Sequence, residues 1–146
     1  MNITAYDKEL LEIFRDSIAV NKIKVEQNVN SFITEMEENF DFGYNGINWN
    51  SNNVIIYENV YNEREEKKNE NIYYFFENLK NNYHNLTDAK IIVIGDNLTN
   101  LGYVMRFDFF CNNSIPFLEL PQDTYIYFLE LKKIINYTFE DEIFFG

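Results

Sequence analysis

The stretch 91-IIVIGDNLTNLGYVMRF-107 decides the fold class of this chain. It opens on four consecutive apolar residues, Ile91–Ile94, a run typical of a buried strand. The turn formers Gly95–Asn97 end that strand. Over Gly102–Phe109, apolar side chains recur at every second position, which predicts another strand with two distinct faces. We therefore expect a β-sheet in the second half of the chain.

The segments that follow extend this sheet. Thr124–Leu131 and Ile134–Phe139 are rich in β-branched and aromatic residues, as strands are. Glu140–Glu142 reads as a turn, after which Ile143–Phe145 pairs back. Between the prolines at 116 and 121 we expect a short helical turn. The last third of the chain is thus predicted to be an antiparallel meander.

The first half of the chain shows helical periodicity instead. Apolar residues in Tyr6–Val20 follow the 3.6-residue period, with Thr4 or Asp7 as a candidate N-cap. A further helical period covers Val25–Phe40, and Ile72–Tyr83 carries its apolar residues on one helix face.

The connections between these helices contain turns and one more strand. Residues 41–53, DFGYNGINWNSNN, have turn chemistry, and their Trp49 either plugs the core from outside or belongs to a binding surface. Val54–Val60 is strand-like, and the charged residues 62–71 form a loop or the exposed start of the next helix. We expect one α+β domain, 1–146, with N-terminal helices packed on a mainly antiparallel C-terminal sheet.

The charge of the chain restricts its partners. It carries 24 acidic and 12 basic residues, for a net charge of -12. Acidic residues outnumber basic ones fifteen to eight in residues 1–85 and nine to four in residues 86–146, so the acidity is not confined to a tail. Such a protein repels nucleic acid and anionic membranes and attracts basic surfaces. Solubility alone is the other explanation of this acidity.

Motifs for catalysis or cofactors are weak. Cys111 lies in an apolar stretch and reads as a structural thiol, and His84 has no identified nucleophile to activate. Asp96 and Asp108 offer at most a carboxylate pair for Mg²⁺ that the spacing does not require. We expect no enzyme, no cofactor and no metal. Without a basic leader or a long apolar run, the protein is predicted to be cytoplasmic.

Three C-terminal segments resemble immunity proteins of bacterial contact-dependent growth inhibition, a polymorphic toxin system. They are 91-IIVIGDNLTNLGYVMRF-107, 120-LPQDTYIYF-128 and 135-INYTFEDEIFFG-146. The shared positions are Gly95-Asp96, Leu120-Pro121 with Tyr125, 137-YTFE-140 and Phe145-Gly146. Asn97 stands where the family often has glycine, and Asp123 where it often has histidine. The resemblance covers about the last 55 residues, and the YNGINWN loop at 44–50 is a further candidate for it.

The resemblance implies a stoichiometric inhibitor of a cognate toxin domain, expected to be a basic nuclease. Carboxylates would then replace nucleic-acid phosphates and aromatic anchors would slow release. The alternative is an acidic nucleic-acid mimic of the anti-restriction or anti-CRISPR kind. The predicted toxin-binding residues combine acids with aromatic or amide neighbours in loops: Asp41, Tyr44, Trp49, Asp96, Asn100, Tyr103, Asp123 and Tyr125. Glu35, Glu37 and Glu38 are further candidates on a helix, and the oligomeric state stays open.

Overall fold

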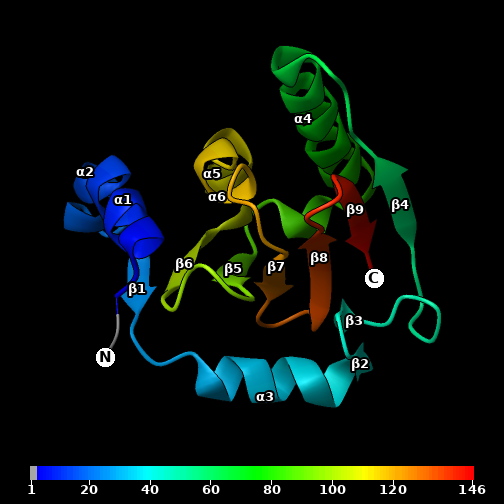
Figure 1. Cartoon of the computed structure of the whole chain (residues 1–146), viewed down its shortest axis with the longest axis horizontal. Coiled ribbons are helices and arrows are strands. Elements are labelled where there is room, and N and C mark those ends of the chain that lie inside the picture. The colour runs from blue at the N-terminus through cyan, green and yellow to red at the C-terminus, as the bar shows by residue number, and fades with distance from the viewer. Residues whose placement is uncertain (1–2) are drawn as a thin grey trace.

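A seven-stranded antiparallel sheet forms the centre of the protein (Figure 1). The computed structural model describes residues 3–146. The strand order in the sheet is β1-β6-β5-β7-β8-β9-β4. The strands are β1 (Lys24–Glu26), β4 (Ile56–Asn59), β5 (Lys90–Gly95), β6 (Gly102–Arg106), β7 (Thr124–Phe128), β8 (Lys133–Tyr137) and β9 (Glu142–Phe145). The strands β7, β8 and β9 are neighbours in chain order, so the predicted meander is confirmed.

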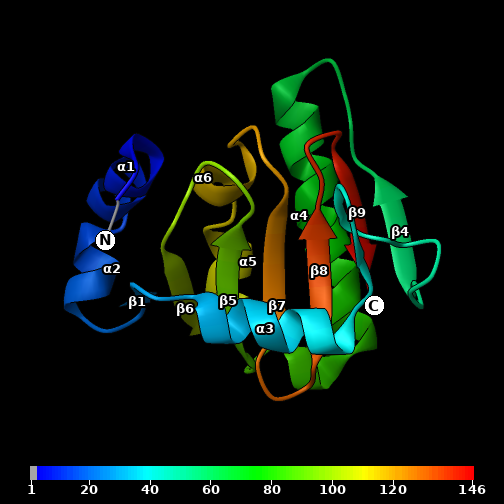
Figure 2. The ribbon, with the colours of Figure 1, turned by 60° about the horizontal axis from the view of Figure 1, so that its bottom comes forward.

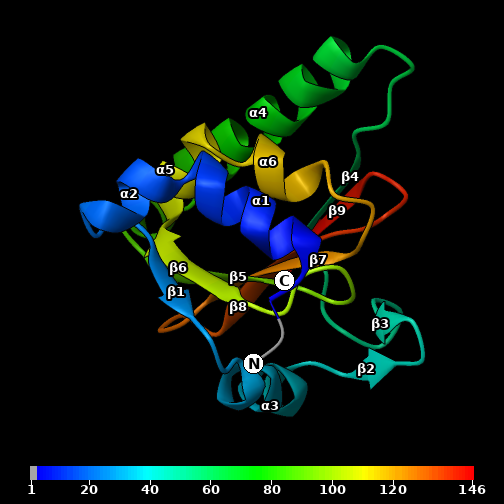
Figure 3. The ribbon, with the colours of Figure 1, turned by 60° about the vertical axis from the view of Figure 1, so that its left-hand side comes forward.

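Helices cover both faces of this sheet, as the views in Figures 2 and 3 show. One face carries α1, α2, α4, α5 and α6, and the other carries α3 with the small hairpin β2–β3. The helices are α1 (Ala5–Ile13), α2 (Arg15–Ala19), α3 (Asn30–Asn39), α4 (Glu65–Asn82), the 3-10 turn η1 (His84–Leu86), α5 (Phe107–Asn112) and α6 (Ile115–Leu118). No helix within residues 3–146 combines the length and apolar character needed to cross a bilayer.

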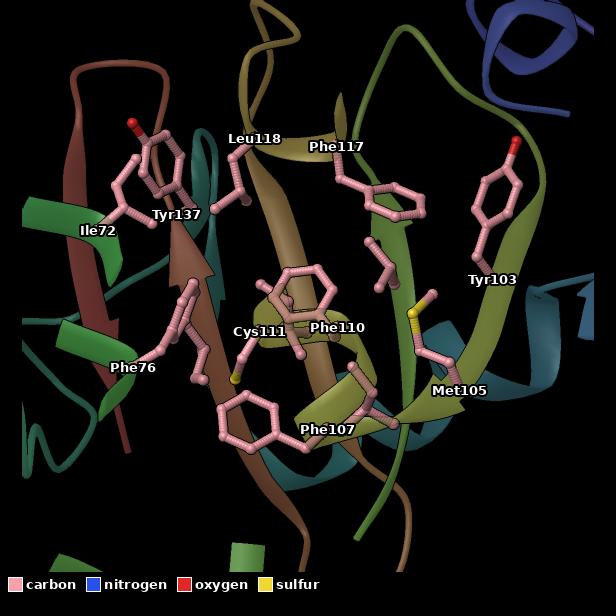
Figure 4. Close-up of a cluster of buried hydrophobic side chains, with 14 of the residues drawn as sticks. Ile72, Phe76, Tyr103, Met105, Phe107, Phe110, Cys111, Phe117, Leu118 and Tyr137 are labelled. Carbon is pink, nitrogen blue, oxygen red and sulfur yellow. The ribbon is translucent and has the colours of Figure 1, made fainter. Parts of the chain in front are cut away.

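Aromatic side chains fill the larger core, between the sheet and the five-helix face (Figure 4). Phe76 of α4 meets Phe107 and Phe110 of α5 edge to face, with ring centroids 5.9 and 5.6 Å apart. Phe107 in turn packs on Phe128 of β7 at 4.9 Å. Edge-to-face contacts of this kind add about 0.5–1.5 kcal/mol each beyond the area they bury. They hold the short α5 firmly on the sheet.

The smaller core lies on the opposite face, under α3 and the hairpin. Ile92 and Tyr127 of the sheet are fully buried there, and Met36 of α3 packs against them. Alternate residues of β5 and β6 therefore serve different cores, since Tyr103 and Met105 face the larger one and Val104 the smaller. Burial on both faces explains why Ile91–Ile94 is continuously apolar.

The expected α+β arrangement is confirmed, with corrections at three places. The helix expected over Tyr6–Val20 is divided at Phe14 into α1 and α2. Helical periodicity from Val25 is wrong, because Val25 lies in β1 and pairs with Tyr103. The second strand ends at Arg106, and Phe107 begins α5.

Candidate functional site

The hairpin formed by β2 (Phe42–Gly43) and β3 (Gly46–Ile47) builds the candidate site. Phe42 pairs with Ile47, so the two-residue tip is Tyr44 and Asn45. Tyr44 is fully exposed at that tip. Gly46 has φ +99°, a conformation that L side chains rarely adopt, and a Cβ there would lie 2.6 Å from the Tyr125 hydroxyl. The hairpin thus sits directly on β7.

Amide and carboxylate groups fix the loop that follows the hairpin. Asn52 donates from Nδ2 to the carbonyls of Asp41 and Asn48 at 2.9 and 2.7 Å, and its Oδ1 accepts from the Asp41 backbone. Ser51 Oγ donates to Asp41 Oδ2 at 2.5 Å. The predicted site residue Asp41 therefore already serves as an acceptor inside the loop, which leaves only part of its carboxylate for a partner.

Trp49 both anchors this loop and faces the site. Its Nε1 donates to Asn136 Oδ1 at 3.0 Å, and its ring stacks on Phe144 with centroids 5.1 Å apart and planes 5° from parallel. Tyr57 packs against the same Phe144 ring at 4.8 Å. The Trp49 side chain itself is only half-buried. These contacts agree with the sequence-based alternative that Trp49 plugs the core from outside. That it belongs to a binding surface stays a prediction.

An open hollow of about 540 Å³ lies beside the hairpin, and we call it the hairpin hollow. Three of the predicted site residues, Tyr44, Trp49 and Asp123, line it. Asn136, Thr138 and Phe144 complete its floor from β8, the following turn and β9. The surface therefore combines aromatic rings, amides and one carboxylate, the groups that anchor protein interfaces.

Burial disfavours the charged form of two carboxylates at this end of the sheet, Asp123 and Asp96. Asp123 Oδ1 accepts from the Phe139 backbone at 2.8 Å, but burial and the nearby charges of Asp96, Glu140 and Glu142 raise the pKa of Asp123. Burial also raises the pKa of Asp96, whose backbone N–H donates to the Asp123 carbonyl. A cation placed here would oppose this effect of burial, because it favours the charged form of both groups.

A second hollow, of about 470 Å³, adjoins Asp96 on the side of α3. Asp96 and Asn100 line it together with Gln27–Asn30. A hydrogen bond fixes the loop that carries Asp96 and Asn100: the Leu98 backbone N–H donates to Gln122 Oε1 at 2.7 Å. The Asp96–Asp123 backbone bond joins this hollow to the hairpin hollow.

Two predicted contact residues are buried and unable to touch a partner. Tyr103 is 1 % exposed and donates its hydroxyl to Asp7 Oδ1 at 2.8 Å. Tyr125 is 4 % exposed beneath Gly46. Burial, followed by the charges of Asp123 and Asp96, raises the pKa of Tyr125, so its hydroxyl stays protonated. The alternation of the strands could not reveal that α1 covers Tyr103 on one face of the sheet and that the hairpin covers Tyr125 on the other.

The helix glutamates also differ from one another. Glu35 forms an ion pair with Lys132 at 2.9 Å, and hydrogen bonds from Tyr127 and Lys132 lower the pKa of Glu35. This acid fixes α3 to the β7–β8 turn. Glu37 and Glu38 are exposed on the same helix and stay candidates for contact.

The residues considered for catalysis are not brought together. Asp96 follows β5, whereas Asp108 follows Arg106, the partner of Lys90 at the opposite end of β5, so a shared Mg²⁺ is ruled out. Burial raises the pKa of the Cys111 thiol to about 12, which keeps it protonated at neutral pH. Within residues 3–146 no cluster of three potential ligand side chains could hold a metal ion.

Sequence reasoning missed the floor of the site. Asn136 and Phe144 lie on strands correctly predicted, but their proximity to Trp49 depends on pairing across β8 and β9. The exposed ring of Phe139 lies at the end of a predicted strand, and the acids Glu140 and Glu142 lie in a predicted turn, so the sequence did not assign them to the site. Comparison of the chain with known protein families, curated proteins and solved structures finds no match.

Proposed function

We propose that this protein is an immunity protein that binds a basic toxin domain through the hairpin hollow and the adjoining Asp96. One observation carries the proposal: Tyr44, Trp49 and Asp123, predicted as contacts from the sequence alone, line one open hollow. Asp96 is joined to that hollow by its backbone bond to Asp123. An exposed aromatic ring beside carboxylates whose pKa is raised by burial is the chemistry of an interface anchor for arginine or lysine.

The charge of the molecule supports the same partner. A net charge of -12 attracts a basic domain over distance and speeds encounter, while the rings in the hollow slow dissociation. The pKa of both Asp96 and Asp123 is raised in the free protein. A partner's cation beside them would stabilise their charged forms and lower both pKa values. Inhibition then follows from occlusion of the toxin in a one-to-one complex, without catalysis by this chain.

The acidic nucleic-acid mimic remains the second hypothesis from the sequence. A mimic needs an unbroken row of carboxylates spaced like phosphates. On α3, which carries Glu35, Glu37 and Glu38, Lys132 neutralises Glu35, so the row is interrupted. We therefore treat mimicry as an outcome of the test below.

Coexpression tests the proposal. The C-terminal domain encoded immediately upstream of this protein's gene is induced alone and together with this protein, and growth and complex formation are measured. The proposal predicts that the domain is toxic alone, and that this protein restores growth and copurifies with it. A harmless domain, or toxicity without rescue, contradicts the proposal. Binding of this protein to a restriction or CRISPR effector instead would favour mimicry.

A further inference from the structure

A third hollow, chemically opposite to the hairpin hollow, lies at the other end of the sheet. It measures about 630 Å³, and its charged lining consists of Lys22, Lys24, Lys90 and Arg106 with one acid, Asp108. We call it the lysine hollow. Its four basic residues are a third of the basic side chains of a chain with net charge -12. This hollow is therefore a local concentration of positive charge on a protein that is acidic overall.

Strand pairing accounts for this convergence. Lys24 of β1 lies opposite Val104 of β6, and Arg106 of β6 lies opposite Lys90 of β5. Residues opposite one another, or two apart on one strand, share a face of the sheet. Lys24, Lys90 and Arg106 thus project from the face of the sheet that carries Val104. Phe109 belongs to α5, on the opposite face. The hollow therefore extends around the edge of the sheet at β1 and β6, where α2 and α5 lie beside these strands (Figure 3).

The cations in this hollow are not equally neutralised. Arg106 is shared by Asp88 and Asp108, and Lys24 Nζ lies 3.1 Å from Glu26. Lys22 and Lys90 form no ion pair with any group in residues 3–146. Two ammonium groups are therefore available to a ligand, and together they match the two charges of a phosphate monoester.

The hollow also has an apolar wall. Val104, Met105 and the half-buried ring of Phe109 line it, and Lys22 Nζ lies 5.9 Å from the centre of that ring. Its volume falls within the range of about 300–1,000 Å³ that is common for small-molecule sites. A phosphate alone would leave this wall uncovered, whereas a planar organic body would cover it.

We infer that the lysine hollow binds a phosphorylated small molecule with a planar apolar body, of the nucleotide class. The phosphate contacts Lys22 and Lys90, and the planar body lies against Val104 and Phe109. Lys90 marks the start of β5, and Asp96 follows its end, so this site is separate from the hairpin hollow. The inference does not depend on the proposed inhibitor function.

Titration followed by amide NMR spectra tests this inference, with adenosine monophosphate, adenosine and inorganic phosphate as probes. We expect adenosine monophosphate to give saturable shifts around Lys22, Lys90 and Phe109, with a dissociation constant near or below about 1 mM. Adenosine and phosphate should each bind the same amides at least about tenfold more weakly. No saturable shift at these residues overturns the inference. Phosphate binding as tightly as the nucleotide also overturns it, because the apolar wall would then play no part.

Charge-matched variants separate a site from general attraction. Lys22→Gln with Lys90→Gln should weaken the nucleotide at least about tenfold. Lys8→Gln with Lys133→Gln removes the same charge at two other lysines without ion pairs in residues 3–146 and should leave affinity unchanged. Equal loss in both double variants contradicts the inference. Spectra without ligand verify that each variant is folded.

Discussion

Asp7 connects the start of the chain to the loop that carries Asp96. Its fully buried carboxylate accepts hydrogen bonds from the backbones of Thr4, Asn100 and Leu101 and from the Tyr103 hydroxyl, whereas the Thr4 hydroxyl donates to the Leu98 carbonyl at 2.7 Å. Thr4 Oγ1 accepts in return from the Asp7 backbone, which closes a capping box on α1. Of the two N-cap candidates in the sequence, Thr4 is the N-cap of α1, and Asp7 is its N3 partner in the capping box.

Replacing Asp7 should therefore destabilise the fold strongly. We expect Asp7→Asn to lower the free energy of unfolding by about 3 kcal/mol or more, because several buried donors lose their acceptor. Tyr103→Phe removes only one of those donors and should cost about 1 kcal/mol. Urea denaturation measures both. An Asp7→Asn protein within about 0.5 kcal/mol of the wild type would contradict the assigned role.

The raised pKa of Asp123 predicts how stability depends on pH. Between its ordinary pKa and the raised value, the folded state binds more protons than the unfolded state, so Asp123 makes stability decrease as pH rises. Asp123→Asn should remove that part of the decrease and retain an acceptor for the Phe139 backbone.

Denaturation at a series of acidic and neutral pH values checks this expectation. Relative to the wild type, Asp123→Asn should gain stability as pH rises through the window. Glu37→Gln removes an acid from the exposed face of α3 and serves as the charge-matched control. If the free energy of unfolding differed between Asp123→Asn and wild type by the same amount at every pH, the pKa of Asp123 would not be raised in the folded protein.

At the scale of elements, the hairpin β2–β3 depends on one residue. Gly46 combines a positive φ with contact to Tyr125, whereas a Cβ at Gly43 would have its nearest neighbours at 3.8 and 3.9 Å, an ordinary contact. The two glycines thus form a matched pair in one hairpin, and only one of them is required for its docking on β7.

Gly46→Ala should destabilise the protein by about 1–3 kcal/mol and loosen the hairpin, since both backbone and contact are strained. Gly43→Ala should change stability by less than about 1 kcal/mol. Trp49 is the only tryptophan, so its fluorescence reports whether the loop next to the hairpin has moved. Equal effects of the two substitutions would contradict the docking argument.

Elements with their own local pattern could be predicted from the sequence, and those set by distant partners could not. Ile72–Tyr83 and Ile91–Ile94 matched α4 and β5, because amphipathic or continuous burial shows in local spacing. Val25 has helical spacing, yet pairing with Tyr103 makes it a strand. Phe107 continues the strand-like alternation of β6, but it also begins a helical pattern, because Phe107, Phe110 and Cys111 share one face of α5.

For the candidate site too, features set by local sequence could be predicted, and features set by distant partners could not. Tyr44 and Asp123 could be selected because acids and aromatics in turns tend to be accessible. Tyr103 and Tyr125 could not be excluded, because their burial requires α1 on one face and the hairpin on the other. Asn136 and Phe144 become part of the site only through the order of β8 and β9.

At the scale of the whole molecule, charge is segregated along the strands. Asp96, Asp123, Glu140 and Glu142 gather where β5 ends, and the lysine hollow lies where it begins. A basic partner approaching this molecule is therefore drawn to the hairpin end and kept from the opposite end. Because of this asymmetry, we expect a basic partner to dock in one orientation, on the acidic end. That orientation is the central claim.

The affinity of this protein for the domain encoded immediately upstream, its proposed partner, tests that claim most directly when it is measured by titration. Tyr44→Ala with Asp123→Asn changes the hairpin hollow without removing a buried packing group. The matched control is Tyr73→Ala with Asp16→Asn, which changes exposed residues on the opposite helical face. We predict at least a tenfold loss for the hollow variant, about 1.4 kcal/mol, and wild-type affinity for the control. Equal affinities for both variants would contradict binding at the hairpin hollow.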